Sequence, residues 1–156
     1  MTDDYERYEK ACKRIRKEND KLLDEFEKYL LSKGLKQKTA EKHVSNIDFY
    51  INDFLLYEDA IKAKNGIHDI GMFLGYWFIK KAMWSSPAQI KSNAASLKKF
   101  YTYMNEKGMV TKEDLDDLKA RIKEDMPEWI ATMKRYDNPS ITNMSEVWGL
   151  EDFDYD

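Results

Sequence analysis

The sequence predicts an all-α fold, a single-domain helical bundle, and three observations lead to this prediction. Long stretches are rich in Lys, Glu, Leu and Ala, which favour helices, and only six Gly and three Pro interrupt the 156 residues. Apolar residues recur every three or four positions, which is the period of a buried helical face. The hydrophobic content of 42% is enough for one core. We therefore expect one domain at residues 1–136 and an acidic tail at residues 137–156.

The first expected helix is long, from about Asp4 to Lys33, and one apolar seam follows it throughout. The seam consists of Tyr5, Tyr8, Cys12, Ile15, Asn19, Leu22, Phe26 and Tyr29. A polar residue at one seam position, here Asn19, can fix the register of a coiled coil, so self-association through this helix is one interpretation. Packing of the seam on another helix of the same chain is the other. Gly34 is expected to end the helix.

A second helix is expected from about Gln37 to Tyr57, with one buried face and one polar face. Four lysines lie in its first turns and in the preceding turn: Lys33, Lys36, Lys38 and Lys42. They lie at the positive end of the helix dipole, and this combination attracts phosphate.

A third helix should begin near Ile67 and lie centrally in the bundle, because it is apolar almost all round. Gly71 and Gly75 each cost roughly 1 kcal/mol in a helix interior relative to Ala, so their presence indicates that another helix crosses there closely. Trp77 and Trp84 are expected in the core, because their neighbours are also apolar.

The fourth helix is the most clearly delimited one. Ser86 is placed to cap its free amides, Pro87 occupies the first helical position, and Gly108 ends the helix. Its buried face contains Ile90, Ala94, Leu97, Tyr101 and Met104. No acidic residue occurs from residue 70 to residue 105, so this helix and its predecessor present positive charge without opposing acids. Such a surface suits a polyanion.

The C-terminal part is expected to contain two further helices and the tail. Thr111 and Asp114 predict the start of a fifth helix, and Pro127 should kink it or restart it as a sixth helix that packs on the first helix. The tail contains six acids and no bases, so the preceding residues carry a net charge of +3 although the whole chain carries −3. We expect the tail to be irregular. It either stays solvated or tempers binding at the lysines, anchored by Trp148, Phe153 and Tyr155.

Several classes of function are disfavoured by the composition. Cys12 is the single cysteine and cannot form an internal disulfide, which fits a reducing compartment, and we expect a cytoplasmic protein. The most apolar run, residues 70–79, is far shorter than the roughly 20 residues of a membrane-spanning helix. One cysteine and two histidines give no metal-ligand spacing, and no Gly-rich phosphate loop is present. We therefore expect no metal, no cofactor and no contact with a membrane.

A family resemblance is carried by two stretches, LLDEFEKYLLSKGLKQKTAEKHVSNIDFYINDFL at residues 22–55 and SPAQIKSNAASLKKFYTYMNEKG at residues 86–108. They resemble the first helix pair and the fourth helix of the core-binding, SAM-like N-terminal domain of tyrosine recombinases and phage integrases. The resemblance implies a SAM-like bundle, here with a long N-terminal helix and extra C-terminal helices. Neither histidine begins the family's His-x-x-Arg element, and the residues after Gly108 are too few for its catalytic domain, so we expect no enzyme.

The resemblance also implies where DNA would bind, because the second and fourth helices of that family contact duplex DNA. The residues at the matching positions are Lys38, Thr39, Lys42, Lys91, Ser92, Asn93 and Ser96, and the charge pattern adds Lys36, Lys98 and Lys99. We therefore expect a non-catalytic DNA-binding module whose binding is weak and salt-dependent. The alternative is a protein-protein interaction bundle that retains the fold but not DNA binding.

Overall fold

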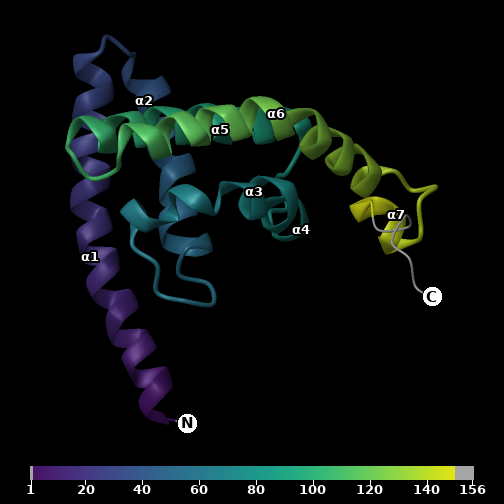
Figure 1. The fold of residues 1–156 in the computed structure, drawn as a ribbon, viewed down its shortest axis with the longest axis horizontal. Coiled ribbons are helices and arrows are strands. Elements are labelled where there is room, and N and C mark those ends of the chain that lie inside the picture. Colours follow the sequence, from purple (N-terminus) through teal and green to yellow (C-terminus); the bar gives the residue numbers. More distant parts are fainter. Residues whose placement is uncertain (1, 150–156) are drawn as a thin grey trace.

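The computed structural model describes residues 2–149, in which helices joined by turns and loops are the regular structure, with no β-strand among them (Figure 1). The elements are α1 (Thr2–Ser32), α2 (Gln37–Asp48), the π-helix η1 (Phe49–Phe54), the 3-10 helix η2 (Ala63–His68), α3 (Ile70–Met72), the π-helix η3 (Phe73–Trp77), α4 (Phe78–Lys81), α5 (Pro87–Glu106), α6 (Lys112–Asp137) and α7 (Met144–Trp148). The all-α prediction is confirmed for this part of the chain. None of its helices is long and apolar enough to cross a membrane.

Helix α1 packs most of its seam on the same chain, whereas Tyr5 at its start is 60% exposed. Phe26 is fully buried in the main core, and Cys12 and Ile15 form a smaller cluster with Leu56. Asn19, the polar residue of the seam, is also buried, and its Nδ2 donates to Asn52 Oδ1 over 2.8 Å and to Ile51 O over 3.3 Å. The side-chain amide of Asn19 is therefore hydrogen-bonded to η1 of the same chain. This matches the second interpretation of the seam, packing within one chain.

The third expected helix exists as α3, η3 and α4 in direct succession. Its buried side chains are Ile70, Phe73, Leu74, Phe78 and Ile79. Helix α6 crosses it at the two glycines, as predicted. A Cβ atom placed on Gly75 would lie 2.8 Å from the ring of Trp129, so the small residue is required for this crossing. The prediction for Trp84 is wrong, because this side chain is 55% exposed although its ring lies 5.1 Å from that of Phe49.

Helix α5 begins and ends as the sequence predicts. Ser86 Oγ accepts a hydrogen bond from the Gln89 N–H over 3.1 Å, Pro87 is the first helical residue, and Gly108 has a φ of +77°. The helix lies between α1, α2, η3 and α6. This central position explains its many buried side chains, which include Ile90, Leu97, Phe100, Tyr101 and Met104.

Helix α6 corrects two expectations about the C-terminal part. It is one continuous helix from Lys112 to Asp137 with the exposed Pro127 inside it, and not two helices. The buried residues Trp129 and Met133 hold its second half against the bundle, which compensates for the hydrogen bond that a proline cannot make. It packs mainly on α5, η2, η3 and α3, so the expected packing of the Pro127 segment on α1 is wrong.

The described part of the tail contains a short helix where irregular structure was expected. Helix α7 lies at the far end of α6 from α1 (Figure 1). The ring of Trp148 lies 4.7 Å from that of Tyr76 and 5.9 Å from that of Tyr136, and Arg135 Nε donates to Val147 O over 2.9 Å. The expected anchors Phe153 and Tyr155 lie outside the described residues.

The two glycines at the α6 crossing give a matched pair of tests. A Cβ on Gly71 would meet only the flexible Arg121 side chain, at 3.5 Å, so Gly71→Ala should raise the free energy of unfolding by at most about 1 kcal/mol. The free energy of unfolding of Gly75→Ala should be about 1–3 kcal/mol lower than that of Gly71→Ala, because the Trp129 ring must move. Urea denaturation of both variants measures this difference, and equal stabilities would refute the close crossing at Gly75.

Candidate anion-binding surface

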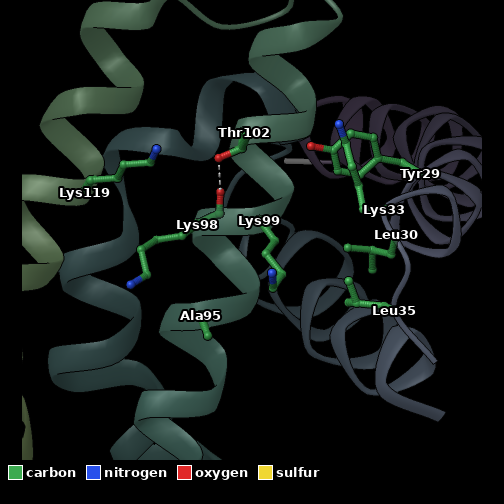
Figure 2. A pocket seen from close by; sticks show the side chains of 9 residues that line it. All are labelled: Tyr29, Leu30, Lys33, Leu35, Ala95, Lys98, Lys99, Thr102 and Lys119. Atoms are coloured by element: carbon green, nitrogen blue, oxygen red, sulfur yellow. Dashed lines mark hydrogen bonds between the residues drawn. The ribbon is translucent and has the colours of Figure 1, made fainter. Parts of the chain in front are cut away.

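Four lysines from three helical segments surround one hollow on the surface. The hollow has a volume of about 540 Å³ and lies over α5, between the end of α1, the α1–α2 turn and α6 (Figure 2). Its lining residues are Tyr29, Leu30, Lys33, Leu35, Ala95, Lys98, Lys99, Thr102 and Lys119. We call it the lysine hollow. None of the residues that line it is acidic, so its lysines face it without opposing carboxylates.

The helical period of α5 places four of these residues on its outward face. Ala95, Lys98, Lys99 and Thr102 are spaced by three, four and seven positions, which is one stripe of a helix. The buried Leu97 and Phe100 turn the opposite side of α5 toward the core. Ala95 and Thr102 are small, so they leave space between the two lysines and the neighbouring helices. This spacing explains why the surface is hollowed here.

The other two lysines reach the hollow from flanking elements. Lys33 follows the last turn of α1, and its Nζ lies 5.4 Å from the centre of the Tyr29 ring, within range of a cation–π contact. Lys119 comes from α6 and extends on the same side of α5 as Lys98 (Figure 2). No ion pair involves Lys33, Lys98, Lys99 or Lys119 within residues 2–149. Their charges are therefore available to an external anion.

Tyr29 forms a neutral wall of the hollow. Its hydroxyl donates to Glu106 Oε2 over 2.7 Å, and burial together with this carboxylate raises the pKa of Tyr29 to about 12. The phenol thus stays protonated at neutral pH and donates its hydrogen bond to Glu106, the last residue of α5. Leu30 and Leu35 complete an apolar floor beside it. An anion in the lysine hollow would meet lysines at the rim and no negative charge among the lining residues.

A buried polar seam joins α2 to α5 beside the hollow. His43 Nδ1 and Ser96 Oγ lie 2.7 Å apart, and Asn46 Nδ2 donates to Ser96 Oγ over 2.9 Å and to Ser92 Oγ over 3.1 Å. Ser96 Oγ also lies 3.1 Å from Ser92 O, which accepts its single proton. With that proton used, the His43 ring donates from Nδ1. We call these four residues the α2–α5 polar seam.

The seam connects the hollow to the lysines of α2. Burial lowers the pKa of His43 first, and the positive charges of Lys99 and Lys42 lower it further. The imidazole is therefore influenced by one lysine of α5 and one of α2.

Most of the residues predicted to contact DNA are accessible. The exposed ones are Lys36, Lys38, Thr39, Lys42, Lys91, Lys98 and Lys99, and Ser92 is half-buried. Asn93 and Ser96 are the exceptions, because both side chains are buried. Their exposed fractions are 2% and 0%, because α2 and the core cover that side of α5, and Asn93 Nδ2 donates to Gln89 O over 2.8 Å. Ser96 instead bonds to α2 through His43 and Asn46.

Sequence reasoning missed two residues of the hollow. Lys119 was not predicted because it follows Asp116 and Asp117 in a stretch of α6 with mixed charges, which does not stand out as basic. Tyr29 was assigned to the α1 seam, and it does pack beside the core while its ring also faces Lys33. Only the packing of α6 along α5 brings these residues to one place, and no local signal announces that packing.

The lowered pKa of His43 predicts how stability depends on pH. The pKa of His43 is lower in the folded state than in the unfolded state, where it has the ordinary value of about 6.5. The stabilising contribution of neutral His43 is therefore complete above about pH 6.5. It is lost as the pH falls from there through the lower pKa of the folded state. Melting temperatures between pH 7.5 and 5 should therefore fall more steeply for the original chain than for His43→Gln.

The exposed His68 provides the matched control for this measurement. His68→Gln should keep the steep pH dependence of the original chain. If His43→Gln and the original chain lose the same stability over this range, the buried imidazole has no role in it.

No family model, curated protein or solved structure matches this chain. The resemblance to recombinase core-binding domains therefore stays a prediction from the sequence.

Proposed function

We propose that this chain is a non-catalytic module that binds duplex DNA through the outward face of α5. The observation that carries the proposal is the convergence of Lys33, Lys98, Lys99 and Lys119 on one hollow without an acid in its lining. The whole chain has a net charge of −3, yet the lining of the hollow contains lysines and no acids. The positive charge there comes from how the fold places the lysines and not from the overall composition. Phosphate groups are the anions that such a surface fits.

The extent of the surface favours a polyanion over a single small anion. Beyond the hollow, Lys91 lies on the exposed side of α5, seven residues or about 10 Å along the helix axis from Lys98. Lys42 extends the surface on α2. Duplex DNA carries about one phosphate per 1.7 Å of its axis, so several phosphates would lie within this span. A line of exposed lysines can then contact successive phosphates of one strand.

The side chains available predict the character of the binding. Lysines are flexible point charges that contact phosphates and carry little sequence information. The buried Asn93 and Ser96 cannot read base edges, although the family resemblance assigned them to the DNA. We therefore propose binding that is weak, largely independent of sequence and strongly dependent on salt.

The fold type and setting belong to the same proposal. We infer a SAM-like bundle of the integrase core-binding type, acting in the cytoplasm without catalysis. The supporting features are the antiparallel pairing of α2 with α5, visible in the contacts of His43 with Ser96 and of Asn46 with Ser92, and the cap signals that delimit α5. The alternative, a protein-interaction bundle, is supported by a different feature, the exposed apolar side chains Met72, Met83 and Trp84.

The lysine hollow can be tested by reversing its charges. The variant Lys33→Glu, Lys98→Glu, Lys99→Glu and Lys119→Glu should lose at least tenfold in affinity for a 20-base-pair duplex at low salt, measured by fluorescence anisotropy. In the original chain, log K should fall with log salt by about 0.9 per phosphate contacted, so weakening four contacts should flatten the slope by up to about 3.6.

A second charge-reversed variant controls for net charge. Lys10→Glu, Lys13→Glu, Lys64→Glu and Lys134→Glu changes four exposed lysines outside the hollow by the same amount. If both variants lose affinity equally, only the total charge matters and the hollow is not the binding surface. If neither loses affinity, or the original chain does not bind the duplex at low salt, the interaction-bundle alternative replaces the proposal.

A further inference from the structure

We propose that a second groove, formed by η1, the loop after it and η3, binds an arginine side chain of a partner protein. The groove has a volume of about 260 Å³ and shares no residue with the lysine hollow. Its lining residues are Phe54, Leu55, Tyr57, Glu58, Asp59, Ile61, Asp69, Met72, Tyr76 and Trp77. We call it the aromatic groove. It combines aromatic walls with carboxylates and contains no Lys or Arg among its lining residues.

The aromatic walls are held in place by contacts with each other. The Trp77 ring lies 5.3 Å from that of Phe54 and 5.6 Å from that of Tyr57, both in edge-to-face arrangements. Tyr76 is positioned from outside by Trp148 of α7, at 4.7 Å. Tyr57 and Tyr76 are 52% and 37% exposed, so their rings are accessible to a ligand. The walls are therefore formed before any ligand arrives.

The chain itself shows that these rings attract cations. Lys81 Nζ lies 5.2 Å from the centre of the Tyr57 ring, and Lys80 Nζ lies 5.5 Å from that of Tyr76. Each ammonium also donates to the phenol oxygen of the same tyrosine over 3.2 Å. Neither lysine lines the groove, so both leave it free for a cation of another molecule.

The carboxylates of the groove lack a positive partner. Glu58, Asp59 and Asp69 form no ion pair within the described residues. Burial raises the pKa of Asp69, while the positive charge of His68 opposes this shift. A partly desolvated carboxylate without a counter-charge is unfavourable, and a cation entering the groove would supply that charge. Anions, including the phosphates of DNA, would be repelled here.

Arginine is the cation that best matches this set of groups. Its planar guanidinium stacks on aromatic rings, donates to two carboxylate oxygens at once and is less strongly hydrated than an ammonium. The groove is large enough for one such side chain. Trp77 lines the groove with its ring, which a planar guanidinium can stack against.

The experiment compares a charged probe with its neutral isostere on the full chain. The peptide acetyl-Gly-Arg-Gly-amide is titrated while the four indole N–H signals are followed by ¹H–¹⁵N NMR. The Trp77 signal should shift in a saturable way, and the same peptide with citrulline should shift it at least tenfold less at equal concentration. An equal response to both peptides, or no response to millimolar arginine peptide, overturns the proposal.

Matched variants locate the binding. Glu58→Gln and Asp69→Asn should each lower the affinity for the arginine peptide by at least threefold. Glu124 is an exposed carboxylate on α6, and Glu124→Gln should leave the affinity unchanged. Glu58 is exposed, so its variant stays informative even if Asp69→Asn perturbs the fold. Affinities unchanged in both groove variants overturn the proposal. DNA affinity of Glu58→Gln should stay unchanged, so this test is independent of the proposed DNA binding.

Discussion

The burial of α5 is the constraint on which the rest of the structure depends. Its apolar side packs on α1, α2, η3 and α6, and Phe100, Tyr101 and Met104 are fully buried. Tyr101 also donates to Ala63 O over 2.7 Å, which ties η2 to the same helix. Only one stripe of α5 is left to solvent. Because that stripe contains Lys91, Lys98 and Lys99, the packing that stabilises the bundle also creates its positive surface.

The α2–α5 polar seam fixes how the two lysine-bearing helices meet. Apolar packing alone would tolerate small shifts along the helix axis, whereas the contacts of His43 and Asn46 with Ser96 exist only in one register. Burial favours the neutral form of His43, and the two nearby lysines favour it further, since protonation would add a third positive charge there. The seam therefore couples the position of the lysines to the stability of the fold.

The parts that the sequence predicted correctly depend on local signals. Ser86, Pro87 and Gly108 act within one helical turn, and the spacing of Gly71 and Gly75 reports a close neighbour without identifying it. The errors depend on long-range packing. A proline normally interrupts a helix, but the burial of residues after it keeps α6 continuous. In the same way, the burial of Asn93 and Ser96 and the contribution of Lys119 follow from which helices cover α5. Trp84 is exposed because no other element within residues 2–149 covers it.

Helix α7 lies beside the aromatic groove and away from the lysine hollow. If Trp148 anchored an acidic segment over the lysine hollow, it would have to lie near Lys119, but it packs on Tyr136, seventeen residues or about 26 Å further along α6. That distance exceeds the screening length of roughly 8 Å at physiological salt, so charges at this end of α6 barely affect the lysines. Trp148 instead supports Tyr76, a wall of the aromatic groove. Because the groove is acidic and the hollow is basic, a cation in one and an anion in the other do not compete for the same residues. The two proposed ligands, an arginine of a partner protein and a phosphate backbone, would therefore not exclude each other.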